Sequence, residues 1–359
     1  MFSQKQQDDI DPLFKSAYDK FDVKDFRGSY LDYSDYLARK PGDAAAIYNK
    51  GLCAIELNDF KDGITNFTKS ISFGRKTADA FFSRGFCLYK LNNFKQAVAD
   101  FDTALSLSPN HTKALTFKGA CLNELMNYEE ALNVLNQAIE SNKNYEYAYF
   151  YRSISNYYLQ NFENGIVDCN KSLAINLHYE TYYWRGLHYK NLQKFKESIR
   201  DYDTLIKYEF KNAKAYAGRA DAFFNSKNYV KALSDNNKSI ELDPGKPETY
   251  FKRALTKFEL GKYNEAEPDF NAAIDLKLNY SENYLSRGIN YLYQKKYAPA
   301  LSDFNKAIEL NPSSSAAFYF RGKLKKVTND AQGSCNDLKQ SQLLGNGKAT
   351  DELTKNGCK

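Results

Sequence analysis

The sequence predicts an all-α protein, a solenoid of about ten antiparallel helix pairs, and three observations support this prediction. A basic residue followed by a small one recurs every 34 residues, with a single interval of 33. An aromatic residue follows nine positions after the small one, and a second small residue stands three positions further on. Each interval holds two apolar stretches with the period of a helix, separated by a short polar turn.

Length and composition are compatible with one long repeat array. The chain has 359 residues, which would suggest two or three globular domains if it had no repeat. It is 43% hydrophobic and 26% charged, enough apolar surface for a large core. The net charge of +6, from 50 basic and 44 acidic residues, is too balanced to indicate nucleic acid or anionic lipid. No apolar run is long enough to predict a membrane span.

The first helix of nine of the ten predicted pairs carries the basic–small dipeptide, which allows close helix approach, whereas the first pair has Ser16-Ala17 there. These dipeptides are Lys50-Gly51, Arg84-Gly85, Lys118-Gly119, Arg152-Ser153, Arg185-Gly186, Arg219-Ala220, Arg253-Ala254, Arg287-Gly288 and Arg321-Gly322. The second helix opens at the recurrent aromatic, which is Phe60, Phe94, Tyr128, Phe162, Phe195, Tyr229, Tyr263 or Tyr297. One pair cannot bury its own apolar face, so neighbouring pairs must stack.

The pattern resembles the tetratricopeptide repeat, whose unit of 34 residues is a helix, a tight turn and a second antiparallel helix. The resemblance implies a right-handed superhelical α-solenoid whose first helices line a concave face. It places an N-terminal tail at 1–9 and the repeat array at 10–348. The ten predicted repeats are 10–43, 44–77, 78–111, 112–145, 146–178, 179–212, 213–246, 247–280, 281–314 and 315–348.

An aspartate follows each repeated arginine by sixteen residues. The pairs are Arg84–Asp100, Arg152–Asp168, Arg185–Asp201, Arg219–Asp235, Arg253–Asp269, Arg287–Asp303 and Arg321–Asp337. Where the repeat has Lys50 or Lys118 instead, the aspartate is missing. We therefore predict an ion pair between the two helices of one repeat, which would occupy the arginines and disfavour nucleic-acid binding.

The other reactive side chains indicate no catalytic or metal site. Cys53, Cys87 and Cys121 recur at 34-residue spacing, and successive repeats are too far apart for them to share a zinc ion, so we expect buried small hydrophobes. Cys169 is interpreted in the same way. The sequence has no phosphate loop, no zinc-ligand spacing and no nucleophile motif. We expect no enzyme activity and no cofactor.

The C-terminal residues resemble the terminal unit of many bacterial, often exported, tetratricopeptide proteins. That resemblance implies a capping helix within 349–359 and a possible disulfide between Cys335 and Cys358, worth about 3 kcal/mol in the chain-entropy model. A lasting disulfide requires an oxidising compartment. No apolar leader follows Met1, so two alternatives stay open: a cytoplasmic protein, or one exported to the periplasm or cell envelope whose leader is absent from this sequence.

The family's ligand positions carry unusually many apolar residues in this chain. Positions 5, 9 and 12 of the first helices lie on one face, and we expect that face to be an aromatic-rich groove. The predicted contact residues are Tyr48, Leu52, Phe82, Phe86, Tyr89, Phe150, Ile154, Tyr157, Tyr158, Tyr183, Leu187, Phe224, Phe251, Leu255, Phe258, Leu285, Ile289 and Leu292.

The resulting functional prediction is a non-catalytic scaffold that holds a protein or peptide segment with apolar anchors. Two alternatives remain open. The aromatic face could be buried in a homodimer with an architectural role, or the chain could be an accessory subunit of an enzyme complex.

Overall fold

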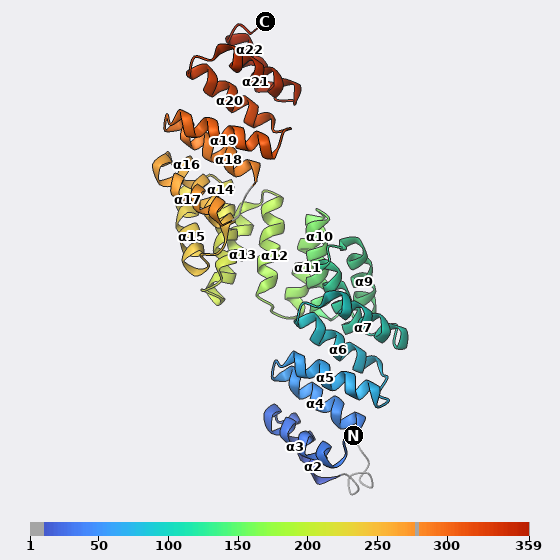
Figure 1. Ribbon diagram of the computed structural model, residues 1–359. Helices are drawn as coiled ribbons and strands as arrows, with labels where there is room; N and C mark the ends of the chain where they lie inside the picture. The colour runs from blue at the N-terminus through green and yellow to red at the C-terminus, as the bar shows by residue number, and fades with distance from the viewer. Residues whose placement is uncertain (1–10, 277–279, 359) are drawn as a thin grey trace. The chain divides into compact units, whose positions relative to one another are not determined.

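The computed structural model describes residues 11–276 and 280–358, and this part of the chain is built from helices without a strand (Figure 1). The predicted all-α architecture of helix pairs followed by a C-terminal helix is confirmed. The predicted N-terminal tail, residues 1–9, lies outside the described residues. Within the described part, no helix combines the length and the apolarity that crossing a membrane requires.

The chain divides into two compact units, unit 1 at Met1–His188 and unit 2 at Tyr189–Lys359. The helices of unit 1 are α2 (Pro12–Asp22), α3 (Phe26–Arg39), α4 (Ala44–Glu56), α5 (Phe60–Ser72), α6 (Ala78–Lys90), α7 (Phe94–Leu107), α8 (Thr112–Glu124), α9 (Tyr128–Ser141), α10 (Glu146–Tyr158) and α11 (Phe162–Ile175). Helix α12 (Glu180–Asn191) contains the point of division.

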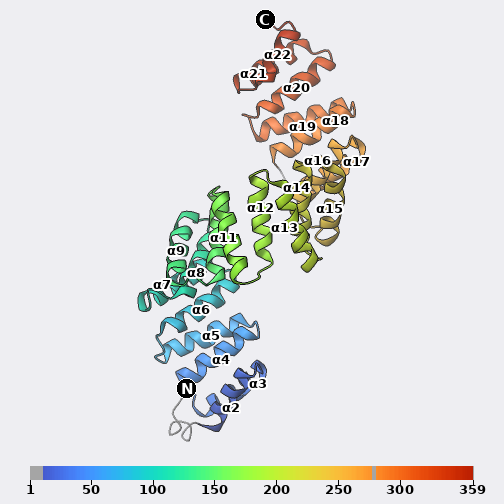
Figure 2. The same cartoon turned by 180° about the vertical axis from the view of Figure 1, so that it is seen from behind.

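Unit 2 continues the same alternation of first and second helices. Its helices are α13 (Phe195–Tyr208), α14 (Ala213–Asn225), α15 (Tyr229–Leu242), α16 (Pro247–Glu259), α17 (Tyr263–Asp275), α18 (Ser281–Tyr293), α19 (Tyr297–Leu310), α20 (Ser315–Val327), α21 (Ala331–Leu343) and α22 (Gly347–Lys355). Within each unit, successive helix pairs lie side by side in both views (Figure 2).

The two helices of a pair run antiparallel, and recurrent serines join their ends. The Ser70 hydroxyl near the end of α5 donates to the Ala44 carbonyl at the start of α4 (2.6 Å). Ser239 does the same to Ala213 (3.0 Å), and Ser341 to Ser315 (2.7 Å). Each bond satisfies a backbone carbonyl across the pair, so these serines are buried without an energetic penalty.

The small residue of the basic–small dipeptide leaves room for a large side chain of the second helix. A Cβ atom added at Gly85 would lie 2.8 Å from the Phe101 ring, and one at Gly288 would lie 2.7 Å from Phe304. Both rings are fully buried. The repeated glycine therefore marks where the aromatic core of each repeat crosses its first helix.

Candidate functional site

The repeated arginines are held by the protein itself. In six of the seven predicted pairs, Nε and Nη2 of the arginine donate to the two carboxylate oxygens of the aspartate sixteen residues later, at 2.5–3.0 Å. These six aspartates are only 2–6% exposed. The hydrogen bonds to Asp303 raise the pKa of Arg287. The prediction is confirmed for these six, and the pair of Arg185 with Asp201 stays a prediction because its members belong to different units.

Each of the seven arginines also makes a contact outside its own repeat, which was not predicted. Its Nη1 atom donates to an acceptor on the second helix of the preceding repeat. The contacts are Arg84–Thr68, Arg152–Asn136, Arg185–Asn170, Arg219–Asp203, Arg253–Asn237, Arg287–Asn271 and Arg321–Asn305, at 2.6–3.4 Å. The signal was present in the sequence, because six of these acceptors stand sixteen residues before their arginine. The guanidinium groups thus join consecutive repeats as well as the two helices of one repeat.

Repeats without the arginine use other contacts. Lys118 keeps only the link to the preceding repeat, with Nζ 2.7 Å from Asp102. In the first repeat, where Ser16 stands in place of the arginine, Asp32 accepts from Ser16 at 2.5 Å and pairs with Lys20 at 2.6 Å. The Lys50 ammonium lies over the Tyr30 ring, 4.5 Å from its centroid.

The repeated cysteines are buried, as predicted. Cys53, Cys87, Cys121 and Cys169 are fully buried thiols. Burial raises the pKa of Cys87 and of Cys121 to about 12, so both stay protonated and unreactive at neutral pH. Among the described residues, histidine, cysteine and carboxylate side chains form no cluster suited to a metal ion.

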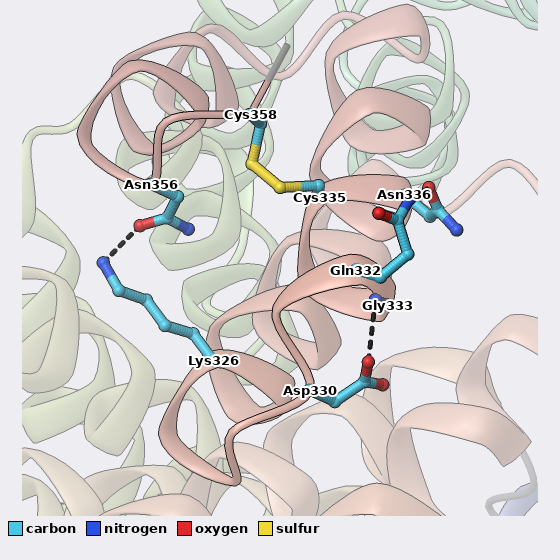
Figure 3. Close-up of a disulfide and its surroundings, with 8 residues drawn as sticks. All are labelled: Lys326, Asp330, Gln332, Gly333, Cys335, Asn336, Asn356 and Cys358. Carbon is cyan, nitrogen blue, oxygen red and sulfur yellow. Dashed lines mark hydrogen bonds between the residues drawn. A yellow bond between two sulfur atoms is a disulfide. The ribbon is translucent and has the colours of Figure 1, made fainter.

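The C-terminal cysteines form a disulfide between Cys335 in α21 and Cys358 after α22, with Cα atoms 5.5 Å apart (Figure 3). Nearby, the Lys326 ammonium donates to the Asn356 side chain, and the Gly333 amide donates to Asp330 at 2.8 Å. Helix α22 buries Ala349 and Leu353 against Leu338 of α21. The disulfide and this apolar contact together fix α22 on the last helix pair.

His188 is the one fully buried histidine in the described part of the chain. Its Nε2 atom lies 3.1 Å from the Ser153 carbonyl, and its ring occupies the space left by the missing side chain of Gly165. Burial lowers the pKa of His188 to about 4. The imidazole is therefore neutral at physiological pH and packs as a core residue.

The predicted contact residues separate into three groups by exposure. Tyr48 and Phe150 are only 8% and 3% exposed. Both were predicted to face a partner, and this is corrected here: their rings belong to the core, Tyr48 beside Phe67 and Phe150 beside His178. Tyr158 is 49% exposed. The remaining residues are half-buried, and they are Leu52, Phe82, Phe86, Tyr89, Ile154, Tyr157, Tyr183, Leu187, Phe224, Phe251, Leu255, Phe258, Leu285, Ile289 and Leu292.

In unit 1, part of the predicted groove is filled by the protein's own rings. The Phe117 ring on α8 is 9% exposed and contacts three rings of α6, those of Phe82, Phe86 and Tyr89, at 5.0–6.1 Å. It also lies 6.1 Å from Tyr151 of α10. The Tyr89 and Tyr151 hydroxyls meet at 3.0 Å, across one intervening repeat. Phe117 and Tyr151 were not predicted because both stand at position 6 of their repeats, whereas the predicted contact residues stand at positions 5, 9, 12 and 13.

In unit 2, the equivalent rings contact their own repeat and, at Phe258, also the next one, because Phe258 of α16 lies 5.1 Å from Tyr293 of α18. Phe251 of α16 lies 5.9 Å from Phe270 of α17, and Phe224 of α14 lies 5.3 Å from Tyr229 of α15. The same first helices also carry a cluster of charged side chains. Asp221 of α14 accepts from Lys252 of α16 at 2.6 Å and from Lys190 of α12 at 3.4 Å. We call the half-buried residues Phe251, Leu255, Phe258, Leu285, Ile289 and Leu292 the unit 2 stripe.

Comparisons with known proteins agree with this architecture. Residues 78–111, 183–247, 247–280 and 281–314 match family models described as tetratricopeptide repeat. A tetratricopeptide repeat protein from Parabacteroides merdae is 22% identical, with a TM-score of 0.53 over 69% of this chain and 98% of that one. The C-terminal part of a repeat protein from Cytophaga hutchinsonii is 20% identical, with a TM-score of 0.51 over 66% of this chain and 99% of that one. No curated protein matches the chain.

Proposed function

The chain is a tetratricopeptide repeat protein, and on this premise we propose that it is a non-catalytic scaffold that holds a partner segment by apolar anchors. Repeats of this family generally serve protein–protein interaction. The proposed binding surface is the unit 2 stripe, and the proposed ligand is an extended or helical segment of another protein.

One observation carries the proposal. The six residues of the unit 2 stripe lie at i, i+4 and i+7 on α16 and on α18, so each triplet follows one helix face. They remain half-buried, and all except Phe258 also pack against buried core residues. Apolar area left exposed on a protein surface commonly marks an interaction site.

The charges around the stripe favour a protein over a nucleic acid. Glu248 and Glu259 on α16 and Glu282 on α18 are exposed, and phosphates would be repelled there. The arginines that would attract phosphates are bound to their aspartates. A homodimer that covers the stripe is the alternative occupant, and light scattering at micromolar concentration separates the two: a monomer supports a free binding surface.

The test is a binding measurement on variants of the stripe. A tagged wild-type chain is purified from its native cells, the co-purifying protein is identified, and binding of that purified protein is measured by calorimetry. Leu255→Asn with Leu292→Asn should weaken binding at least about tenfold, because two apolar contacts are lost.

Val230→Asn is the matched control, because Val230 is 71% exposed on the second helix α15. It should bind as the wild type does. A double variant of the stripe that stays folded by circular dichroism and binds with unchanged affinity would refute the proposal, as would a stable dimer that covers the stripe.

A further inference from the structure

Two aromatic pairs occupy the same place in the two units, at the edge where helices of a pair turn. In unit 1, Tyr128 opens α9 and stacks on Tyr158, the last residue of α10, with ring centroids 4.4 Å apart and planes 10° apart. In unit 2, Tyr263 opens α17 and lies 5.2 Å from Tyr293, the last residue of α18. The two edges are therefore matched sites that can be compared residue by residue.

The unit 1 edge forms an open pocket of about 530 Å³ with apolar and acidic walls. Its lining includes Met126, which is 75% exposed, and Leu159. Glu129 and Glu130 complete the wall, both exposed in the first turn of α9. In the part of the chain that the structure describes, neither glutamate takes part in an ion pair, and no cation lies over the rings of the Tyr128–Tyr158 pair.

The unit 2 edge carries its own cations. Lys262 and Lys296 line its pocket of about 410 Å³, at the positions that Asn127 and Asn161 hold in unit 1. The Lys262 ammonium lies 3.2 Å from Glu265, and the Lys296 ammonium lies 2.7 Å from Glu267. The acidic groups there are neutralised within the chain, whereas those of the unit 1 edge are not.

This difference determines what the unit 1 pocket can attract. The dipole of helix α9 favours acidic residues in its first turn, which explains the position of Glu129 and Glu130. Among the described residues, no basic side chain pairs with either of them. Burial and the Glu124 carboxylate both raise the pKa of Tyr128, so the negative potential extends to the rings. A stacked aromatic pair beside unpaired carboxylates suits a planar cation, which can lie on a ring and donate to an oxygen.

We propose that this unit 1 pocket binds an arginine side chain of a partner protein, with the guanidinium on the Tyr128 ring, which lines the pocket and stacks on Tyr158, and with hydrogen bonds to Glu129 or Glu130. The site lies at the turn edge of unit 1, apart from the unit 2 stripe. It therefore stands or fails independently of the proposed function.

The single tryptophan of the chain reports on this site, because the Trp184 ring lies 6.1 Å from the Tyr158 ring. The protein is titrated with N-acetyl-arginine amide while Trp184 emission and ligand-observed NMR are recorded. The neutral analogue N-acetyl-citrulline amide, which has nearly the same shape, is the control. We expect saturable binding of the arginine compound and at least about fivefold weaker binding of the citrulline compound.

Variants locate the binding. Glu129→Gln with Glu130→Gln keeps both rings and should weaken arginine binding at least about fivefold, and Tyr158→Leu should do the same in the NMR readout. The matched variant Tyr293→Leu in unit 2 should bind as the wild type does. Equal binding of the two compounds, no saturable response, or undiminished binding by the double glutamine variant would each overturn the assignment.

Discussion

The two units are built from the same repeat but connect their repeats in different ways. In unit 1, aromatic rings of successive first helices pack on one another, and Phe117 touches rings from both neighbouring repeats. In unit 2, four successive repeats each carry the arginine that binds its own aspartate and the preceding repeat. Unit 1 interrupts this series with Lys50 and Lys118.

The comparison shows that the apolar side chains of the first helices can pack against neighbouring repeats or stay partly exposed at the surface. In unit 2, the arginine contacts join each repeat to the preceding one, and the Phe258–Tyr293 ring contact lies between two of its first helices. In unit 1, Lys118 keeps a link to the preceding repeat but, among the described residues, has no aspartate partner in its own, and the adjacent Phe117 is buried among rings of both neighbouring repeats. The same residue positions can thus be core in one unit and surface in the other.

The largest expected effect comes from removing the central ring of unit 1. Phe117→Ala should lower the free energy of unfolding of unit 1 by about 4 kcal/mol, because a buried ring that contacts rings of two other helices, α6 and α10, is lost. Chemical denaturation followed by circular dichroism, which reports on the helices of both units, measures it. Phe251→Ala, at a half-buried ring of unit 2, should lower the free energy of unfolding by about half as much. Equal losses for the two variants would contradict the difference between the units.

Breaking an arginine contact in unit 2 should cost more stability than breaking the corresponding lysine contact in unit 1. Arg287→Met leaves the Asp303 carboxylate, 5% exposed, without its partner and should cost about 3 kcal/mol. Adding Asp303→Asn should recover part of that loss. Lys118→Met in unit 1 breaks a pair with the half-exposed Asp102 and should cost less than about 1 kcal/mol in the same denaturation experiment. A cost for Arg287→Met as small as for Lys118→Met would contradict the structural role of the arginines.

The buried histidine gives unit 1 a pH dependence. The pKa of His188 is about 4 in the folded protein and about 6.5 in the unfolded chain, so only the unfolded chain takes up the proton between these values. Stability is therefore constant above pH 6.5 and falls as the pH drops below it, by roughly 2 kcal/mol at pH 5. Denaturation of the wild type and His188→Gln at pH 7.5 and pH 5.0 checks this, and the variant should lose less stability between the two.

The smallest expected effect concerns the link between repeats. Asn271→Ala removes the acceptor of the Arg287 Nη1 atom, 2.8 Å away, and should cost about 1 kcal/mol. Thermal melting compares it with Asn271→Asp, which restores an acceptor as Asp203 does for Arg219. Equal melting temperatures for Asn271→Ala and the wild type would mean that this contact adds nothing to stability.

The sequence predicted what depends on periodicity and could not predict what depends on side-chain direction. Spacing identified the helices and the arginine–aspartate pairs, because both recur at fixed intervals. It did not reveal that Phe150 points into the core, since burial at a given position depends on the side chains of neighbouring repeats. Tyr158 illustrates the same limit: its assignment to the groove stays a prediction, and the spacing gave no sign that its ring stacks on Tyr128.

Hydrogen–deuterium exchange of the chain with and without its purified partner tests the scaffold proposal most directly. We expect the bound partner to slow the exchange of backbone amides in α16 and α18, which carry the unit 2 stripe. Slowed exchange confined to other helices, with α16 and α18 unchanged, would contradict it.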